Sequence, residues 1–274
     1  DTRKRERLTM PMAASNPSNP REDAPVPPAL PSDEIRSIMW RLTDRQDLWQ
    51  MVRAARQVAR GPVARLVAAG QRDTCQWTSE KGDLLDELDR AGVSAIFADP
   101  EFGGPLAGPK SLATALAAYE LAWVDGGAAT CLIALGLALQ PIISAGTDQQ
   151  RARYLRGSVP AREPGEPRKL LRGAFCLTEP LPYAGVDTGV LSGKVRVVKD
   201  RSAAVRTGMD EPLLQVQKRG RFTNNMDFAN FVVVAVASDD SLIRGTCMII
   251  LEEGDPGTFD RGAVTHKLVH QLTS

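Results

Sequence analysis

The sequence contains few of the residues that mark metal sites and common nucleotide folds. Its 274 residues include only two histidines, His266 and His270, and four cysteines that lie far apart without forming a CxxC pair. This argues against a zinc site, which needs closely spaced thiolate and imidazole ligands. No GxGxxG motif follows a strand-like segment, and its absence excludes the Rossmann mode of dinucleotide binding.

The chain also lacks a charge excess and a long apolar run. Its 34 basic and 33 acidic side chains give a net charge of +1, so the charge gives no reason to expect nucleic acid as a partner. The longest apolar stretch, residues 128–139, is shorter than the roughly 18 residues that a membrane span needs. We therefore expect a buried core helix there, and no membrane span.

Targeting signals are equally scarce. The basic N-terminus has no apolar segment behind it, so no signal peptide is visible. The cysteines lie in apolar contexts, which predicts reduced thiols in the cytoplasm or in another reducing compartment such as the mitochondrial matrix.

The composition divides the chain into three parts. Residues 1–31 are polar and proline-rich, which predicts a flexible arm whose basic cluster either stays solvated or contacts an acidic partner. Residues 32–168 show helical spacing of apolar residues, and residues 169–274 hold short β-branched segments between turns. Helices followed by strands predict an α+β protein: an all-helical domain, then an antiparallel β barrel or sandwich.

Within the helical part, capping patterns and apolar stripes indicate the helix positions. A stripe at Leu48, Val52, Ala55 and Val58 follows a possible capping box at 43–46, and Gly61-Pro62 is expected to end that helix. Further helices are predicted at 79–91, 110–123, 126–144 and 148–156, the last opening with a second capping box, "TDQQ".

Five segments, in this order, resemble the acyl-CoA dehydrogenase family of flavoenzymes. They are "AGVSAIFADPEFGG" (91–104), "AYELAWVDGGAAT" (118–130), "AGTDQQRARYLRG" (145–157), "GAFCLTEP" (173–180) and "KRGRFTNNMDFANFVVVAVA" (218–237). The resemblance implies a helical and a middle β domain, and FAD as cofactor. It also implies a third, C-terminal helical domain, which supplies the catalytic glutamate in that family and has no counterpart before Ser274.

The resemblance assigns flavin contacts at two places. The Leu-Thr-Glu-Pro turn implies Phe175, Leu177 and Thr178, and the later segment implies Phe222 and Thr223. A redox ring needs fixed hydrogen-bond donors at its polar edge, and Pro180 stiffens that turn. At the position where the family usually has tryptophan, this chain has Arg221, which would either stabilise reduced flavin or indicate a non-standard pocket. If the two sequences are aligned one residue differently, Phe222 takes the place of the tryptophan. The turn also has a purely structural interpretation, as the end of a strand.

Substrate contacts are less well marked. After Pro180 the family carries Gly-x-Gly-Ser-Asp, which contacts acyl-CoA, whereas this chain has "LPYAGVDTG". The resemblance implies Gly185, Asp187 and Thr188 as substitutes, and a simple loop is the alternative. We expect Glu101 to be structural beside turn-forming glycines, and the two histidines to be surface or interface residues.

The expected function is flavin-dependent α,β-dehydrogenation of an acyl-CoA thioester in fatty-acid metabolism, within an assembly that supplies the C-terminal domain. Electron-transferring flavoprotein would be the acceptor, and the chain would form homo- or hetero-oligomers. The alternative is a non-catalytic scaffold or binding subunit of the same fold. A third interpretation is an interaction protein that docks through residues 1–31.

Overall fold

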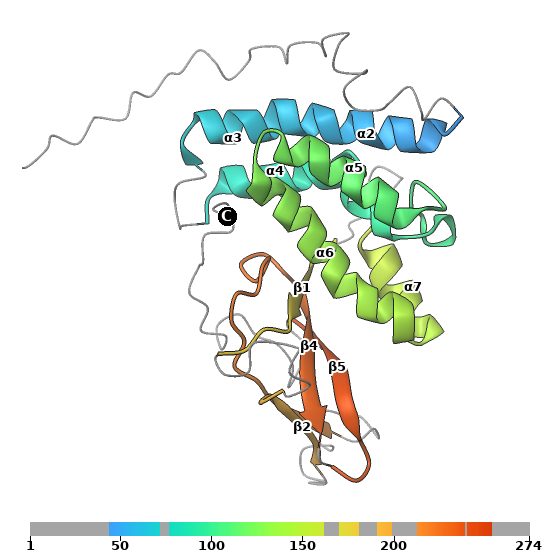
Figure 1. Cartoon of the computed structure of the whole chain (residues 1–274), viewed down its shortest axis with the longest axis vertical. Helices are drawn as coiled ribbons and strands as arrows, with labels where there is room; N and C mark the ends of the chain where they lie inside the picture. Colours follow the sequence, from blue (N-terminus) through green and yellow to red (C-terminus); the bar gives the residue numbers. More distant parts are fainter. Residues whose placement is uncertain are drawn as a thin grey trace, which may run out of the picture.

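A computed structural model describes residues 44–71, 77–161, 170–180, 191–198, 213–238 and 240–253 of the chain. Helices come first and strands follow, so the predicted α+β class is confirmed (Figure 1). The helices are α2 (Gln46–Val58), α3 (Ala64–Ala68), α4 (Ser79–Arg90), α5 (Lys110–Ala122), α6 (Gly126–Ala145) and α7 (Asp148–Gly157). The strands are β1 (Gly173–Cys176), β2 (Lys194–Val198), β3 (Leu213–Gln217), β4 (Phe231–Ser238) and β5 (Gly245–Glu252).

The predicted apolar stripe of α2 faces the protein interior. Leu48, Val52, Ala55 and Val58 are all buried, as their helical spacing requires. The helix begins after Arg45, two residues later than a cap at position 43 would place it. Arg45 instead forms two hydrogen bonds with the carboxylate of Asp47 in the first turn.

The prediction that Gly61-Pro62 ends this helix is wrong. A π-helical turn (Ala59–Val63) leads directly into α3. The N–H of Ala64 reaches the carbonyl of Ala59, five residues earlier, and this widened turn accommodates Pro62, which has no N–H to donate. Proline therefore changes the pitch of a continuing helical rod here, and Gly61 and Val63 remain buried inside it.

The helices predicted at 79–91, 110–123, 126–144 and 148–156 are α4 to α7, and all four are confirmed to within one residue. The "TDQQ" capping box is also confirmed, because Thr147 and Gln150 exchange side-chain to backbone hydrogen bonds at the start of α7. Asp125 caps α6 by accepting hydrogen bonds from the N–H groups of Gly127 and Ala128.

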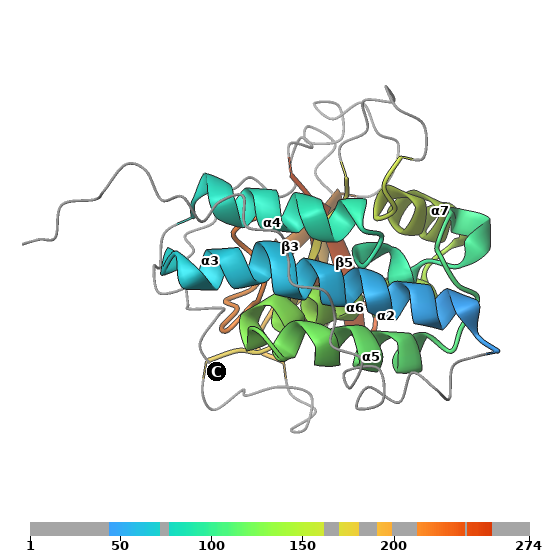
Figure 2. The same cartoon turned by 90° about the horizontal axis from the view of Figure 1, so that it is seen from above.

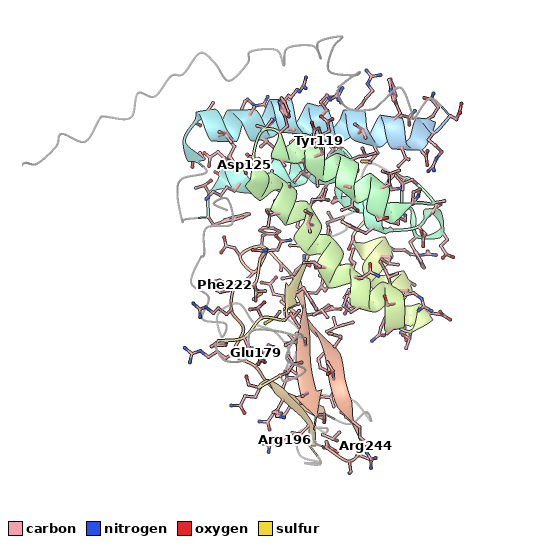
Figure 3. The ribbon with its side chains drawn as sticks, viewed as in Figure 1. Tyr119, Asp125, Glu179, Arg196, Phe222 and Arg244 are labelled. Atoms are coloured by element: carbon pink, nitrogen blue, oxygen red, sulfur yellow. The ribbon has the colours of Figure 1, made fainter. Side chains whose placement is uncertain are left out.

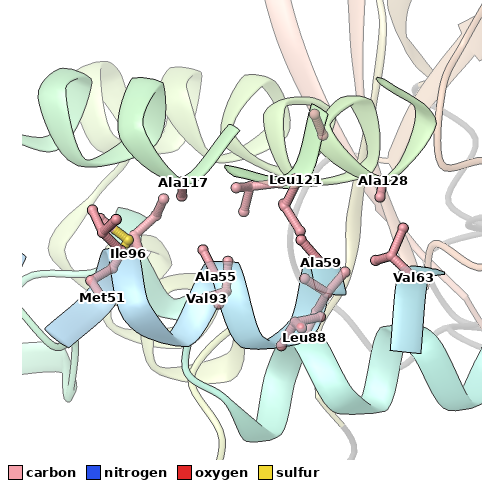
Figure 4. Close-up of a cluster of buried hydrophobic side chains, with 14 of the residues drawn as sticks. Met51, Ala55, Ala59, Val63, Leu88, Val93, Ile96, Ala117, Leu121 and Ala128 are labelled. Carbon is pink, nitrogen blue, oxygen red and sulfur yellow. The ribbon is translucent and has the colours of Figure 1, made fainter. Parts of the chain in front are cut away.

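Helix α2 packs against α4 and α5, and together they enclose the first part of the core (Figure 2). The close-up in Figure 4 shows small and large side chains meeting between these helices. The buried residues labelled there are Met51, Ala55, Ala59, Val63, Leu88, Val93, Ile96, Ala117, Leu121 and Ala128. Alanines on α2 and α5 allow the two helices to approach closely.

The five described strands form one mixed sheet, whereas we predicted an antiparallel barrel or sandwich. The central strand β4 pairs antiparallel with β5 along its whole length, and β2 pairs antiparallel with β3. On its other edge β4 meets two strands in succession, both parallel: first β1, from Gly173 to Cys176, and then β2, at Lys194. The sequence did not distinguish parallel from antiparallel pairing. Because β4 is buried almost throughout, its residues do not alternate between apolar and polar types.

Helix α6 joins the helical layer to the sheet. Leu135, Ala138, Leu139 and Ile142 pack in one buried cluster with residues of α7 and with Phe231 of β4. By length and composition, α6 is the one helix among the described residues that meets the criteria for a membrane span, a test that core helices also pass. In this fold it lies at the centre of the molecule, between α5, α7 and β1 (Figure 1).

The Pro-Glu-Phe-Gly-Gly segment forms a turn, as expected. A 3₁₀ helix (Pro100–Phe102) ends at Gly103, which has a φ of 94°. Gly104 is required for a different reason, because a Cβ there would lie 1.8 Å from the carbonyl oxygen of Ala98. Glu101 is exposed on this turn.

Candidate functional site

The two segments that the resemblance assigned to flavin lie side by side in the structure. We call residues 177–180 the Thr178 turn and residues 218–225 the Phe222 loop. The N–H of Arg221 donates to the carbonyl of Thr178 at 2.8 Å. Figure 3 labels Glu179 of the turn and Phe222 of the loop, which lie on the side of β4 away from β5. Residues 181–217 separate these two segments in the sequence, and the fold brings them together.

A buried ion pair lies beneath the turn. Glu179 is fully buried and accepts hydrogen bonds from the Nζ of Lys218 at 2.7 Å, from the N–H of Gly193 at 2.8 Å, and from both the N–H and the hydroxyl of Ser192. Burial acts to raise the pKa of the Glu179 carboxyl, but these hydrogen bonds outweigh it and lower the pKa to about 2. Glu179 is therefore an anchor, not an acid-base group at neutral pH.

Lys218 is the second anchor and belongs to the Phe222 loop. Its ammonium donates to the carbonyl of Leu177 at 2.9 Å and to the carbonyl of Ala235 on β4 at 2.8 Å, in addition to Glu179. The side chain is 5% exposed. Sequence analysis missed both residues as functional candidates, although Lys218 directly follows β3 and Glu179 comes three residues after the end of β1.

The predicted cofactor residues on β1 and its turn have distinct surroundings. Phe175 is half-buried and packs against the cluster that α6 and α7 form with the sheet. Leu177 and Thr178 are half-buried at the turn. Within the described residues the hydroxyl of Thr178 has no hydrogen-bond partner, so it is free to bond to a ligand.

The residues of the Phe222 loop combine an exposed ring with positive charge. Phe222 adopts a φ of 56° and is 58% exposed, and the guanidinium of Arg221 lies 4.5 Å from the centre of its ring. Arg219 is also exposed. An exposed aromatic face beside cationic groups suits a flat ligand that carries negative charge.

Thr223 turns back toward β1. Its side chain hydrogen-bonds Cys176. Burial raises the pKa of the Cys176 thiol, and the hydrogen bond with Thr223 partly offsets that increase. Gly220 leaves room for that approach, because a Cβ at this position would lie 2.3 Å from the sulfur of Cys176. Of the five predicted cofactor residues, Leu177, Thr178, Phe222 and Thr223 thus gather around one junction, while Phe175 lies inward along β1.

The donor set at this junction fits a flavin in chemical terms. Threonine hydroxyls at 178 and 223 are suitable partners for the polar edge of an isoalloxazine ring, and Phe222 offers an apolar face. Arg219 and Arg221, both exposed, place positive charge beside it, which suits the phosphates of FAD. The predicted substrate residues Gly185, Asp187 and Thr188 lie outside the described residues, as do His266 and His270.

A hollow of about 550 Å³ lies at the opposite end of β1, which the sequence did not predict. It is lined by the Trp77–Phe228 ring pair and by Asp86, Asp89 and Arg172. Arg172 is held by both carboxylates, and the hydroxyl of Ser94 donates to Asp89. These paired charges join α4 to the residue that precedes β1, so they stabilise the contact between the helices and the sheet.

Comparison with known proteins gives a family for the helical part. Residues 45–160 match the family described as acyl-CoA dehydrogenase, N-terminal domain. No curated protein sequence matches the chain.

Solved structures match the described fold more widely. A structure of the electron transferring flavoprotein of Acidaminococcus fermentans has 26% identity and a TM-score of 0.59, over 77% of this chain and 49% of that one. A probable acyl-CoA dehydrogenase from Mycobacterium abscessus has 22% identity and a TM-score of 0.57, over 80% and 50%. An acyl-CoA dehydrogenase complexed with FAD from Bacillus anthracis has 18% identity and a TM-score of 0.58, over 76% and 32%. The chain thus spans half or less of the length of these relatives.

Proposed function

We propose that this chain, which belongs to the acyl-CoA dehydrogenase family by its N-terminal domain and its fold, binds FAD between the Thr178 turn and the Phe222 loop. The observation that carries the proposal is the hydrogen bond from the N–H of Arg221 to the carbonyl of Thr178, which brings both predicted cofactor segments to one place. The FAD complex of a relative with the same fold supports it.

The reaction would be α,β-dehydrogenation of an acyl-CoA thioester. Bound FAD would supply the hydride acceptor. Thr178 and Thr223 would hydrogen-bond the flavin, Phe222 would pack against it, and the exposed Arg219 and Arg221 would attract its phosphates. No described residue here is assigned as the base that removes the substrate's α-proton, so the proposal includes an assembly in which another domain or chain supplies that group.

An apolar surface on α5 and α6 supports such an assembly. Leu112 and Tyr119 on α5 are exposed, as are Trp123 directly after it and Ile133 and Leu137 on α6. The charged residues of 110–145 all bond elsewhere: Lys110 to backbone carbonyls, Glu120 to Arg56, and Asp125 to the start of α6. Interface cores are typically rich in aromatic residues and poor in charge. We therefore propose that the chain forms homo- or hetero-oligomers. We also propose electron-transferring flavoprotein as the acceptor of the electrons, and a reducing compartment as the location of the protein.

The same surface favours a second candidate function, a non-catalytic scaffold subunit that keeps the fold and binds a catalytic partner. FAD titration of the purified protein, followed by flavin fluorescence and visible absorption, separates the two. The proposed function predicts saturable binding that Phe222→Ala weakens and that Trp123→Ala, at the exposed residue directly after α5, leaves unchanged. A protein that stays colourless and elutes free of FAD would support the scaffold instead.

A further inference from the structure

The hydrogen bonds of the sheet are interrupted beside the candidate flavin site. Along one edge of β4, the pairing with β1 ends at Val234, opposite Cys176, and the pairing with β2 starts at Ala237, opposite Lys194. The carbonyl of Ala235 lies in this gap, and none of the described strands pairs with it on that edge. Buried carbonyl groups need a hydrogen bond, so the gap must be filled by something other than backbone.

Lys218 and Glu179 fill the gap. The ammonium of Lys218 uses its three hydrogens on Ala235, on Leu177 where β1 ends, and on Glu179. The carboxylate of Glu179 in turn accepts from the N–H groups of Ser192 and Gly193, which lead into β2. The two side chains thus replace the missing backbone pairing between the end of β1 and the start of β2.

This arrangement lets the turn leave the sheet while its position stays fixed. Lys218 holds the Thr178 turn by donating hydrogen bonds to the carbonyl of Leu177 and to the carboxylate of Glu179. The N–H of Arg221 holds it at a third point, the carbonyl of Thr178. Lys218 and Arg221 both belong to the Phe222 loop. A change in the position of Lys218 therefore changes how the turn and the loop face one another.

We infer that Lys218 is a positioning residue of the flavin site, which sets the hydroxyl of Thr178 relative to the Phe222 loop without touching the cofactor. The inference rests on the proposed function, because it assigns Lys218 a role toward the FAD bound there. The charge of Lys218 is balanced by Glu179, so its contribution is the geometry that it imposes on the turn and the loop.

The test compares FAD affinity and folding stability in matched variants. Lys218→Met removes the three hydrogen bonds at similar side-chain length, and Lys218→Arg retains a cation with several donors. Lys110→Met is the matched control, because Lys110 also bonds two backbone carbonyls, those of Ala98 and Leu106, but lies in the helical layer. Dissociation constants come from flavin fluorescence quenching, the flavin environment from visible circular dichroism, and stability from urea unfolding without FAD.

We expect Lys218→Met to weaken FAD binding at least about tenfold, which corresponds to about 1.4 kcal/mol, and to change the visible circular dichroism, because the Thr178 turn and the Phe222 loop lose the contacts that fix their relative position. Lys218→Arg should restore most of the affinity, and Lys110→Met should lower stability while leaving the affinity unchanged. Equal affinities of wild type and folded Lys218→Met would overturn the inference, as would an equal loss in Lys110→Met.

Failure of the proposed function and failure of the Lys218→Met variant to fold can both be distinguished from failure of the inference. A wild-type protein that binds no FAD refutes the proposed function itself. If Lys218→Met does not fold, the double variant Glu179→Met with Lys218→Met replaces the buried pair by apolar side chains, a change that folded proteins often tolerate. Weak FAD binding by that folded double variant supports the inference, and wild-type affinity overturns it.

Discussion

The guanidinium of Arg56 on α2 meets the carboxylate of Glu120 on α5 inside the helical core. Its Nε donates to Oε2 at 2.8 Å and its Nη2 donates to Oε1 at 2.9 Å, and both side chains are buried. Around this pair the two helices contact each other through alanine and leucine side chains. Two parallel hydrogen bonds therefore fix the register of a contact that apolar packing alone would hold less specifically.

Removing one member of this pair should cost far more than removing both. We expect Arg56→Met to lower the free energy of unfolding by about 3–5 kcal/mol, because it leaves the Glu120 carboxylate buried without its cation. The double variant Arg56→Met with Glu120→Met should recover most of that loss. Urea unfolding measures both, and Arg90→Ala, at the exposed pair with Glu87, should stay within about 1 kcal/mol of wild type. A double variant as unstable as the single one would contradict this account.

Gly104 should tolerate no side chain. A Cβ there would lie 1.8 Å from the carbonyl oxygen of Ala98 and 2.5 Å from its carbon, so the backbone must move. We expect Gly104→Ala to destabilise the protein by about 1–3 kcal/mol in thermal or urea unfolding. Gly126→Ala is the control, since nothing lies within 4 Å of its Cβ, and it should leave stability unchanged or raise it by up to about 1 kcal/mol. Equal effects at the two glycines would argue against the close approach at Gly104.

The helices were predictable because local signals agree in them. Thr147 and Gln150 form their capping box within four residues, and the stripe of α2 repeats at helical spacing, so nearby sequence suffices. Pro62 was misjudged because the π turn that accommodates it depends on packing against α4 and α5. Strands do lie within residues 169–274, as expected, but the parallel pairing of β1 with β4 was not predicted, since strand direction follows from chain connections and not from residue alternation.

The candidate site was predictable only in part, and through the family resemblance. Thr178 and Phe222 were identified by their motifs, and the fold brings their segments together. The pairing of Glu179 with Lys218 has no local signal, because 39 residues separate them and both are common surface residues. Their importance follows from the gap in the sheet, which only the pairing of the strands reveals.

Asp125 should stabilise α6 as its N-terminal cap. It accepts hydrogen bonds from the N–H groups of Gly127 at 2.8 Å and Ala128 at 3.1 Å. We expect Asp125→Ala to cost about 0.5–2 kcal/mol and Asp125→Asn to cost only a few tenths, because asparagine caps helices nearly as well as aspartate. Thermal unfolding followed by far-ultraviolet circular dichroism distinguishes them. An asparagine variant as unstable as the alanine variant would mean that the negative charge, and not the cap, is what the site requires.

Glu179 should make stability depend on pH in a defined window. Although burial opposes it, the hydrogen bonds from Lys218, Ser192 and Gly193 lower the pKa of Glu179 to about 2, against 4.5 for an ordinary glutamate. Because the folded-state pKa lies below the unfolded value, the ionised carboxylate stabilises the fold fully above about pH 4.5, and this contribution is lost as the pH falls toward 2. A shift of this size corresponds to something on the order of 3 kcal/mol.

The measurement is the difference in unfolding free energy between wild type and Glu179→Gln, taken by urea unfolding at steps from about pH 7 to about pH 3. Glutamine keeps the shape of the side chain but cannot ionise, so Glu179→Gln should be less stable than wild type at neutral pH. The difference should stay constant down to about pH 4.5 and then narrow, because below that pH the unfolded wild-type chain binds a proton at Glu179 while the folded protein, with its lower pKa, does not. A difference that stays flat to about pH 3 would mean that Glu179 stabilises the turn through its shape and hydrogen bonds, with no contribution from its charge.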